Sequence, residues 1–301
     1  MDTTWDCIVV GAGAAGLSAA LVLGRARRRT LVIDAGGQSN RAADGIGGLL
    51  GNDRTPPDSF YAHGRGELAA YPAVELRAGT VAAARRSDPG FVVELADGSV
   101  EVARRMLLAT GMDYRRPSLP GVEERWGRSV FHCPFCHGWE VRDQPLAVLG
   151  GGPHGVHRAL LLRAWSDDVT LLTSGEALAD EERERVVAAG VPIDEREVVA
   201  LEGPGEELEA VVFADGTRRA CRGLLVPVTL HQRSGLAAQL GAETAERGPV
   251  VADALAVDAS YRTSVPGLFA AGDVSAQMQS VALAVASGHM AGAMVVADLV
   301  V

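Results

Sequence analysis

The sequence predicts an α/β protein made of two similar three-layer domains, the second inserted into the first. Twice along the chain, a short apolar run leads into a glycine-rich turn, an alanine- and leucine-rich stretch and a second apolar run. These units cover residues 7–34 and 146–172. The order strand, glycine turn, helix, strand is typical of parallel sheets covered by helices. The length of 301 residues also fits two domains.

The first glycine turn is Gly-Ala-Gly-Ala-Ala-Gly at residues 11–16. Gly11 permits the tight turn, Gly13 lets the backbone approach a pyrophosphate, and Gly16 lets helix and strand pack closely. The helix expected to follow, up to about residue 28, directs partial positive charge at a phosphate. Asp34 ends the next strand and can accept hydrogen bonds from a ribose. The pattern therefore predicts a Rossmann-like dinucleotide site and disfavours a turn that binds nothing.

The segments that follow the two units also resemble each other. Hairpin turns are predicted at residues 95–98 and 213–216, and each leads to another apolar run, at 106–111 and 224–229. These parallels indicate a duplicated domain.

The C-terminal stretch from residue 261 to 301 belongs to neither copy. It contains Gly-Leu-Phe-Ala-Ala-Gly-Asp at 267–273 and then a long helix rich in Ala, Val and Met. We expect this stretch to return and complete the first domain. The predicted first domain is thus discontinuous, covering 1–115 and 243–301, and the inserted domain covers 116–242.

Composition excludes several functional classes. The formal net charge of −10 disfavours nucleic acid as a partner. The acidic start is unlike a signal peptide, and no stretch approaches the roughly 20 uninterrupted apolar residues that cross a bilayer. We therefore expect a cytoplasmic protein without membrane partners. Of the four cysteines, Cys7 and Cys221 are expected to be small buried hydrophobes.

The other two cysteines, Cys133 and Cys136, lie in His-Cys-Pro-Phe-Cys-His-Gly at 132–138. At this spacing a disulfide can open and close with little backbone motion, and such motifs lower the pKa of one thiol. His137 has the ionisable group suited to taking and returning a thiol proton. His132 is a second candidate, with a surface or capping role as its alternative.

Three other interpretations of the pair are disfavoured. A c-type haem attachment site shares the Cys-x-x-Cys-His spelling but lacks an export signal. A zinc site would need a second group of ligands, so no metal is expected. A structural disulfide is uncommon in the cytoplasm.

Together, the first glycine turn, Ala-Thr-Gly at 109–111, Ala-Gly-Asp at 271–273 and the inserted Cys-x-x-Cys resemble the thioredoxin reductase-like flavoprotein family. The resemblance covers essentially the whole chain. It implies two Rossmann-like domains, FAD in the first domain and a homodimer.

The resemblance also implies the residues that bind FAD. Gly272 and Asp273 would hold the ribityl-pyrophosphate region, Val81 the adenine through its backbone, and Gln279 a helix start near the pyrimidine ring. The full implied set is Gly11, Gly13, Ala14, Ala15, Gly16, Asp34, Ala35, Gln38, Asn40, Arg41, Val81, Ala109, Thr110, Gly111, Gly272, Asp273 and Gln279.

The same resemblance assigns roles to the cysteines: Cys136 faces the flavin and Cys133 exchanges with the substrate. Thioredoxin reductases usually carry an Asp after the second cysteine, whereas this chain has His137. That departure, with His132 on the other side, is similar to the small-molecule dithiol oxidases of gliotoxin and holomycin biosynthesis. These enzymes close a disulfide and pass electrons to oxygen.

The second glycine turn departs from the pattern of an NADPH site. Pro153 removes a backbone N–H from the turn, and His154 places a bulky ring where small residues let a pyrophosphate approach. The strand at 169–172 is followed by no arginine that could bind a 2′-phosphate, although Glu176 could serve NADH. Pro-Val-Thr at 227–229 replaces the Ala-Thr-Gly of the first copy. We expect this nucleotide site to be vestigial.

Without NADPH, a dithiol substrate becomes the expected source of electrons. A substrate thiolate would attack Cys133 and release Cys136, a second substrate thiol would close the product disulfide, and oxygen would reoxidise FAD to give hydrogen peroxide. The alternatives are a reductase fed by NADPH or ferredoxin, acting on a thioredoxin-like protein, and a flavin-binding sensor without turnover. The segment 45–57 is expected to line the disulfide and influence specificity.

Overall fold

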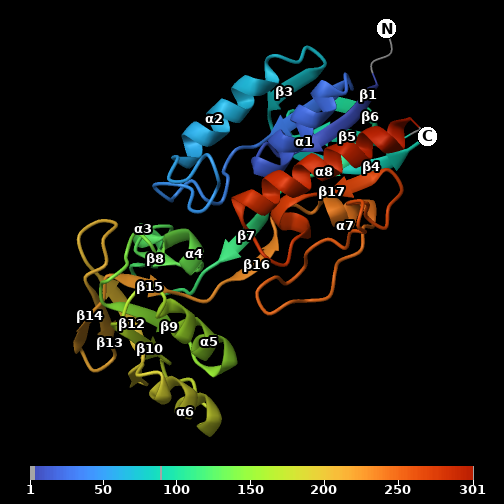
Figure 1. Cartoon of the computed structure of the whole chain (residues 1–301). Helices are drawn as coiled ribbons and strands as arrows, with labels where there is room; N and C mark the ends of the chain where they lie inside the picture. The colour runs from blue at the N-terminus through green and yellow to red at the C-terminus, as the bar shows by residue number, and fades with distance from the viewer. Residues whose placement is uncertain (1–3, 89, 301) are drawn as a thin grey trace. The chain divides into compact units, whose positions relative to one another are not determined.

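The computed structural model describes residues 4–88 and 90–300 (Figure 1). The chain divides into two compact units. The first takes in the chain up to Ser39, Pro57–Tyr114 and the chain from Thr229 onward, and the second consists of Asn40–Pro56 and Arg115–Val228.

Both units are therefore discontinuous, and the boundaries differ from the expected insertion at 116–242. Residues 229–242 belong to the first unit because the Gln239 side chain accepts a hydrogen bond from the Ala84 N–H at 3.0 Å. Residues 40–56 belong to the second unit, where Gly47 lies against the Cys136 carbonyl. No local sequence signal predicts the unit to which either segment belongs, since each assignment depends on contacts with a distant segment.

A mainly parallel sheet forms the centre of the first unit. The parallel strands follow the order β3-β2-β1-β6, β17 pairs with the other side of β6, and β5 and β4 continue from β6 in antiparallel fashion. The strands are β1 (Trp5–Val10), β2 (Thr30–Asp34), β3 (Val74–Ala78), β4 (Val81–Ser87), β5 (Gly90–Leu95), β6 (Val100–Leu108) and β17 (Leu268–Ala270). The helices are α1 (Ala14–Arg25), α2 (Pro57–Leu68), α7 (Leu236–Leu240) and α8 (Val281–Leu299), with a 3-10 turn η1 (Gly272–Ser275).

Helix α1 ends three residues before the expected end at 28. Arg27 adopts a left-handed conformation with φ of 59°, and its N–H donates to the Gly24 carbonyl. The Arg28 N–H then donates to the Leu23 carbonyl at 3.0 Å. This closing turn satisfies the last carbonyls of the helix and directs the chain into β2.

Helix α8 packs closely against α1 in the first unit (Figure 1). A Cβ atom at Gly288 would lie 2.1 Å from the Ala15 carbonyl oxygen, and one at Gly292 would lie 2.8 Å from that of Ala19. Glycine is required at both positions because the two backbones touch. Among the described residues, α8 alone is long and apolar enough to cross a membrane by length and composition. In the structure, Gly288 and Gly292 pack α8 against α1 within this unit.

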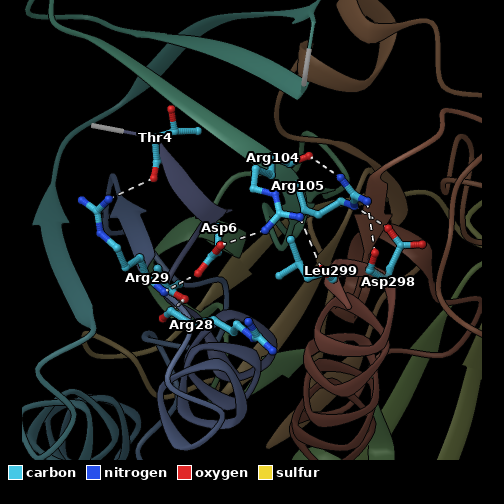
Figure 2. Close-up of polar contacts among 9 residues, drawn as sticks. Thr4, Asp6, Arg28, Arg29, Arg104, Arg105, Asp298 and Leu299 are labelled. Atoms are coloured by element: carbon cyan, nitrogen blue, oxygen red, sulfur yellow. Dashed lines mark hydrogen bonds and ion pairs between the residues drawn. The ribbon is translucent and has the colours of Figure 1, made fainter. Parts of the chain in front are cut away.

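Charged contacts anchor the C-terminal end of α8 to the sheet (Figure 2). Arg105 on β6 pairs with Asp298, and the Arg104 guanidinium donates to the Leu299 carbonyl at 3.3 Å. Arg104 also pairs with Asp6 on β1 at 3.3 Å. These contacts join the first strand of the chain to its last helix.

The second unit repeats the parallel arrangement. Its strand order is β11-β10-β9-β15-β8, so β10-β9-β15 matches β2-β1-β6 of the first unit. Its strands are β8 (Val130–Phe131), β9 (Leu146–Leu149), β10 (Val169–Leu172), β11 (Ile193–Asp194) and β15 (Gly223–Leu225), with an antiparallel sheet of β12 (Val198–Glu202), β13 (Ala210–Phe213) and β14 (Arg218–Ala220). Its helices are α3 (Val122–Arg125), α4 (Pro134–His137), α5 (Gly152–Leu162) and α6 (Asp180–Ala188).

Both predicted hairpins are present, between β5 and β6 and between β13 and β14. A separate two-stranded sheet pairs β7 (Met112–Arg115) with β16 (Thr229–Gln232). The α/β fold with two Rossmann-like halves is confirmed.

Candidate active site

The first glycine turn joins β1 to α1 as expected. Gly11 has φ of 101°, and a Cβ atom there would lie 2.3 Å from the Ala109 carbonyl oxygen. A Cβ atom at Gly16 would lie 1.8 Å from the Gly11 carbonyl oxygen, so helix and turn are in direct contact. The turn thus brings Ala109, Thr110 and Gly111, which directly follow β6, beside the start of α1.

The space above Gly13 is open, because a Cβ atom there would meet only the Gln38 side chain, at 3.9 Å. Gly13 caps α1 without a side-chain hydrogen bond, and the first turn of α1 holds no acidic residue. The N–H groups of Ala14, Ala15 and Gly16 at this helix start are therefore suited to an anion. These features fit the pyrophosphate of a dinucleotide.

Asp34 ends β2 beside this turn. Its carboxylate accepts the Ala12 N–H at 3.0 Å and contacts the Gln38 amide at 3.4 Å and the Arg65 guanidinium at 3.3 Å. The sequence predicted Asp34 and Gln38 but not Arg65, which comes from α2. Ala35 follows Asp34 directly, so it lies at the same sheet edge.

A second acidic residue, Asp273, lies in η1. Next to it, Gly272 has φ of 79°, and a Cβ atom there would lie 2.8 Å from the Ala15 side chain. The Tyr114 hydroxyl donates to the Asp273 carboxylate at 3.1 Å. Burial raises the pKa of Asp273 to about 6, while the Tyr114 hydrogen bond and the charge of Arg233 act in the opposite direction.

The remaining predicted cofactor residues divide between the units. Val81 begins β4 and is buried, and Gln279 lies just before Ser280, the N-cap of α8. Asn40 and Arg41 instead belong to the segment that packs with the second unit. Their place in the cofactor site stays a prediction.

The cysteine pair lies at the start of α4. Cys133 is the N-cap residue with extended backbone, Pro134 is the first helical residue, and Cys136 follows one turn later. The structure holds both cysteines as thiols, each partly buried. A hydrogen bond from the Cys136 thiol lowers the pKa of Cys133; burial opposes this effect, and the backbone N–H groups of Cys136 and Phe135 add to it. These contacts therefore favour the ionised form of Cys133.

Two histidine rings flank the pair. His137 stacks on Phe131 with ring centroids 5.6 Å apart, and His132 stacks on Trp126 at 5.7 Å. Burial lowers the pKa of His132 to about 4, and the positive charges of Arg158 and of His137 in its protonated form act in the same direction.

His137 is a neutral base. Burial lowers its pKa, and the Cys133 and Gly127 carbonyls only partly oppose this. Among the described residues, neither buried ring nitrogen of His137 has a hydrogen-bond partner of good geometry. The ring can therefore accept a proton from a neighbouring thiol.

The segment 45–57 borders the cysteine pair, as expected. Gly47 approaches so closely that a Cβ atom would lie 2.9 Å from the Cys136 carbonyl oxygen. A small cavity lies between this segment and α4, and Cys136, Phe135, Trp139 and Arg54 contribute to its lining. The residues Phe135 and Trp139 are 68% and 58% exposed, so two aromatic rings are available beside the thiol.

Comparison with known proteins identifies a family that matches this chain. The model of the pyridine nucleotide-disulphide oxidoreductase family matches residues 5–288. The chain belongs to this family.

Relatives agree with that assignment. Thioredoxin reductase tcpT of Claviceps purpurea (strain 20.1) is 34% identical over 96% of this chain and 92% of its own length. The crystal structure of HlmI is 38% identical, with a TM-score of 0.93, covering all of this chain and 94% of that one. An oxidoreductase from Agrobacterium tumefaciens is 36% identical, with a TM-score of 0.91 and 97% coverage of both chains. The expected resemblance to thioredoxin reductases is confirmed.

In this pyridine nucleotide-disulphide oxidoreductase, the second glycine turn joins β9 to α5. A Cβ atom at Gly155 would lie 2.2 Å from the Gly150 carbonyl oxygen, which repeats the contact of Gly16 with Gly11. Pro153 lies in the first turn of α5, as expected, and His154 is exposed. Four residues after the end of β10, Glu176 contacts the turn through its carboxylate, and no arginine lies between β10 and Glu176.

The other two cysteines of this family member play no part in the site. Cys7 and Cys221 are buried, and burial raises the pKa of both thiols, that of Cys221 to about 12. Sequence reasoning missed Arg65, Tyr114 and Trp139. No motif marks them, because each is defined by what it contacts in the fold.

Proposed function

We propose that the protein is an FAD-dependent dithiol oxidase that closes an intramolecular disulfide in a small-molecule dithiol. Molecular oxygen is the electron acceptor, and hydrogen peroxide is the second product. The observation that carries this proposal is the second glycine turn, where the Glu176 carboxylate is present and no arginine or lysine lies between the end of β10 and Glu176 to bind a 2′-phosphate. If this turn binds no NADPH, the dithiol substrate becomes the expected source of electrons.

The first turn fits FAD. The N–H groups at the start of α1 would hold the pyrophosphate, Asp34 a ribose, and Asp273 the ribityl hydroxyls. FAD, when bound, accepts two electrons from the enzyme dithiol and transfers them to oxygen. The net reaction is balanced: one dithiol and one O2 give one disulfide and one H2O2.

Cys133 is suited to exchange with the substrate. A substrate thiolate attacks the Cys133 sulfur of the enzyme disulfide, and Cys136 leaves. The second substrate thiolate then attacks the substrate sulfur bonded to Cys133, which forms the product disulfide and expels Cys133. Thiols of lower pKa leave faster, and the Cys136 thiol and two backbone N–H groups stabilise the Cys133 thiolate.

His137 handles the protons of these steps. Its ring is neutral at neutral pH because burial lowers its pKa, so it can take a proton from an incoming thiol. The cavity bordered by Gly47, Phe135 and Trp139 supports a compact substrate, whose rings can contact the two exposed aromatic side chains. By resemblance, we also propose that the enzyme is a homodimer.

Anaerobic mixing tests the direction of electron flow. The purified enzyme is mixed with a small dithiol or with NADPH, and flavin bleaching near 450 nm is followed. We expect bleaching by the dithiol only. In a separate aerobic assay, we expect dithiol-dependent oxygen uptake by the wild type and its loss in Cys133→Ser and Cys136→Ser. Cys221→Ser is the matched control, since this buried thiol lies outside the site. Rapid bleaching by NADPH would instead establish a reductase.

A further inference from the structure

We propose that Glu176 is an internal ligand of the second glycine turn and is the residue that excludes dinucleotide phosphates from it. This inference rests on the same turn as the proposed function, but it assigns the exclusion to one side chain. The alternative is a turn disabled by the loss of the Pro153 N–H and the bulk of His154.

The Glu176 side chain lies directly on the turn. Its carboxylate accepts the Gly151 N–H at 2.7 Å. A Cβ atom at Gly151 would lie 3.1 to 3.2 Å from three carbons of this side chain, and one at Gly152 would lie 3.4 Å from its Oε1 atom. The carboxylate therefore binds the Gly151 N–H and lies beside Gly152.

Backbone contacts hold Glu176 in this position. Its N–H donates to the Thr173 carbonyl at 3.0 Å, and the Gly175 N–H donates to the Glu195 carbonyl at 3.0 Å. Ser174 and Gly175 both have positive φ, 51° and 84°, so the chain reverses sharply after β10. The Ser174 hydroxyl accepts the Val198 N–H at 3.0 Å. The turn that carries Glu176 is thus fixed from two sides.

The first unit provides an internal comparison. There, Asp34 accepts the N–H of Ala12, which occupies the position of Gly151, at 3.0 Å. The Asp34 charge is shared with Arg65, and the space above Gly13 stays open. Glu176, by contrast, makes no ion pair within the described part of the chain, and its carboxylate extends over Gly152.

The chemistry of the helix start explains this arrangement. Pro153 removes one N–H from the first turn of α5, but the positive end of the 11-residue helix remains. A carboxylate stabilises such a helix end, as a phosphate does. A phosphate arriving at this helix start would meet the like charge of Glu176, which already accepts the N–H of the N-cap residue Gly151. Glu176 thus substitutes for the ligand and repels it.

Titration calorimetry on the FAD-saturated enzyme tests the role of Glu176. The variants are Glu176→Ala, which removes the side chain, and Glu176→Gln, which keeps its shape without the charge. Glu184→Gln is the matched control, because it removes one exposed negative charge from α6 of the same unit. The probes are ADP, which carries a pyrophosphate without a 2′-phosphate, and NADPH. Near-UV circular dichroism verifies that each variant is folded.

We expect ADP to bind Glu176→Ala at least tenfold more tightly than the wild type and Glu184→Gln, with a smaller gain for Glu176→Gln. Equal ADP affinity in all four proteins, or tight NADPH binding by the wild type, would overturn the inference. Oxygen uptake with a dithiol is measured in parallel. If the wild type shows no dithiol-dependent oxygen uptake, the proposed function is wrong. If uptake is normal but Glu176→Ala binds ADP no more tightly than the wild type, only the role of Glu176 is wrong.

Discussion

The Tyr114 hydroxyl donates a hydrogen bond of 3.1 Å to the Asp273 carboxylate across 159 residues of sequence. Tyr114 comes from β7, next to the Ala-Thr-Gly segment, and Asp273 from η1, next to α1. Burial raises the pKa of Asp273 to about 6, so this carboxyl changes charge within an accessible pH range. The hydrogen bond favours the ionised form.

Tyr114→Phe is expected to raise the pKa of Asp273 further, because it removes a donor to the carboxylate. If the ionised form holds the cofactor, FAD affinity falls as pH decreases through the Asp273 pKa, and in the variant this fall begins at higher pH. Fluorescence of released FAD across pH 4.5 to 8 would measure both midpoints. Tyr71→Phe is the control, since its hydroxyl accepts a hydrogen bond from the Arg25 guanidinium and has no contact with Asp273 among the described residues. Identical midpoints in all three proteins would contradict a role for Tyr114.

Cys136→Ala is expected to raise the pKa of the Cys133 thiol, because the Cys136 hydrogen bond is the largest cause of its lowering. Cys136→Ser retains a donor and should raise the pKa less. The rate of iodoacetamide alkylation against pH reports the thiolate fraction of Cys133 in each variant. A Cys133 pKa that is equal in the two variants would show that backbone N–H groups, and not the second side chain, stabilise the thiolate.

His137→Asn is expected to lower the turnover number for dithiol oxidation by about 10²-fold, with little change in KM, because a general base is lost. In the wild type, burial lowers the His137 pKa below its ordinary value, so the acid limb of the activity profile should lie below the pKa of an ordinary histidine. His63→Asn, an exposed change on α2, is the control. A wild-type acid limb at pH 6.5 or above would argue against a neutral buried His137.

Gly47→Ala is expected to displace the segment 45–57 from the cysteine pair, since the new Cβ would lie 2.9 Å from the Cys136 carbonyl oxygen. Overpacking of this kind costs about 1 to 3 kcal/mol. We expect kcat/KM for the dithiol to fall by roughly tenfold or more at that cost. Gly66→Ala on α2 meets nothing within 4 Å and should leave kcat/KM unchanged. Equal kcat/KM values in both variants would show that the position of the segment 45–57 against the cysteine pair does not affect dithiol oxidation.

The features that could be predicted from the sequence are those encoded by neighbouring residues. The glycine turns at 11–16 and 150–155, both hairpins and the cysteine pair follow local patterns of apolar runs and small residues. The missed features depend on distant contacts. Arg65 approaches Asp34 from α2, and Gln239 ties α7 to β4, so neither has a local signal.

The packing of α8 on α1 has a consequence for biosynthesis. The second unit is complete once residue 228 has left the ribosome, whereas β6 awaits its neighbour β17 and α1 awaits Gly288 and Gly292. Domains fold as units during synthesis. The inserted unit, with its thiols, is therefore the first to mature, and the nascent first unit keeps one face of α1 uncovered until Gly288 and Gly292 have been synthesised.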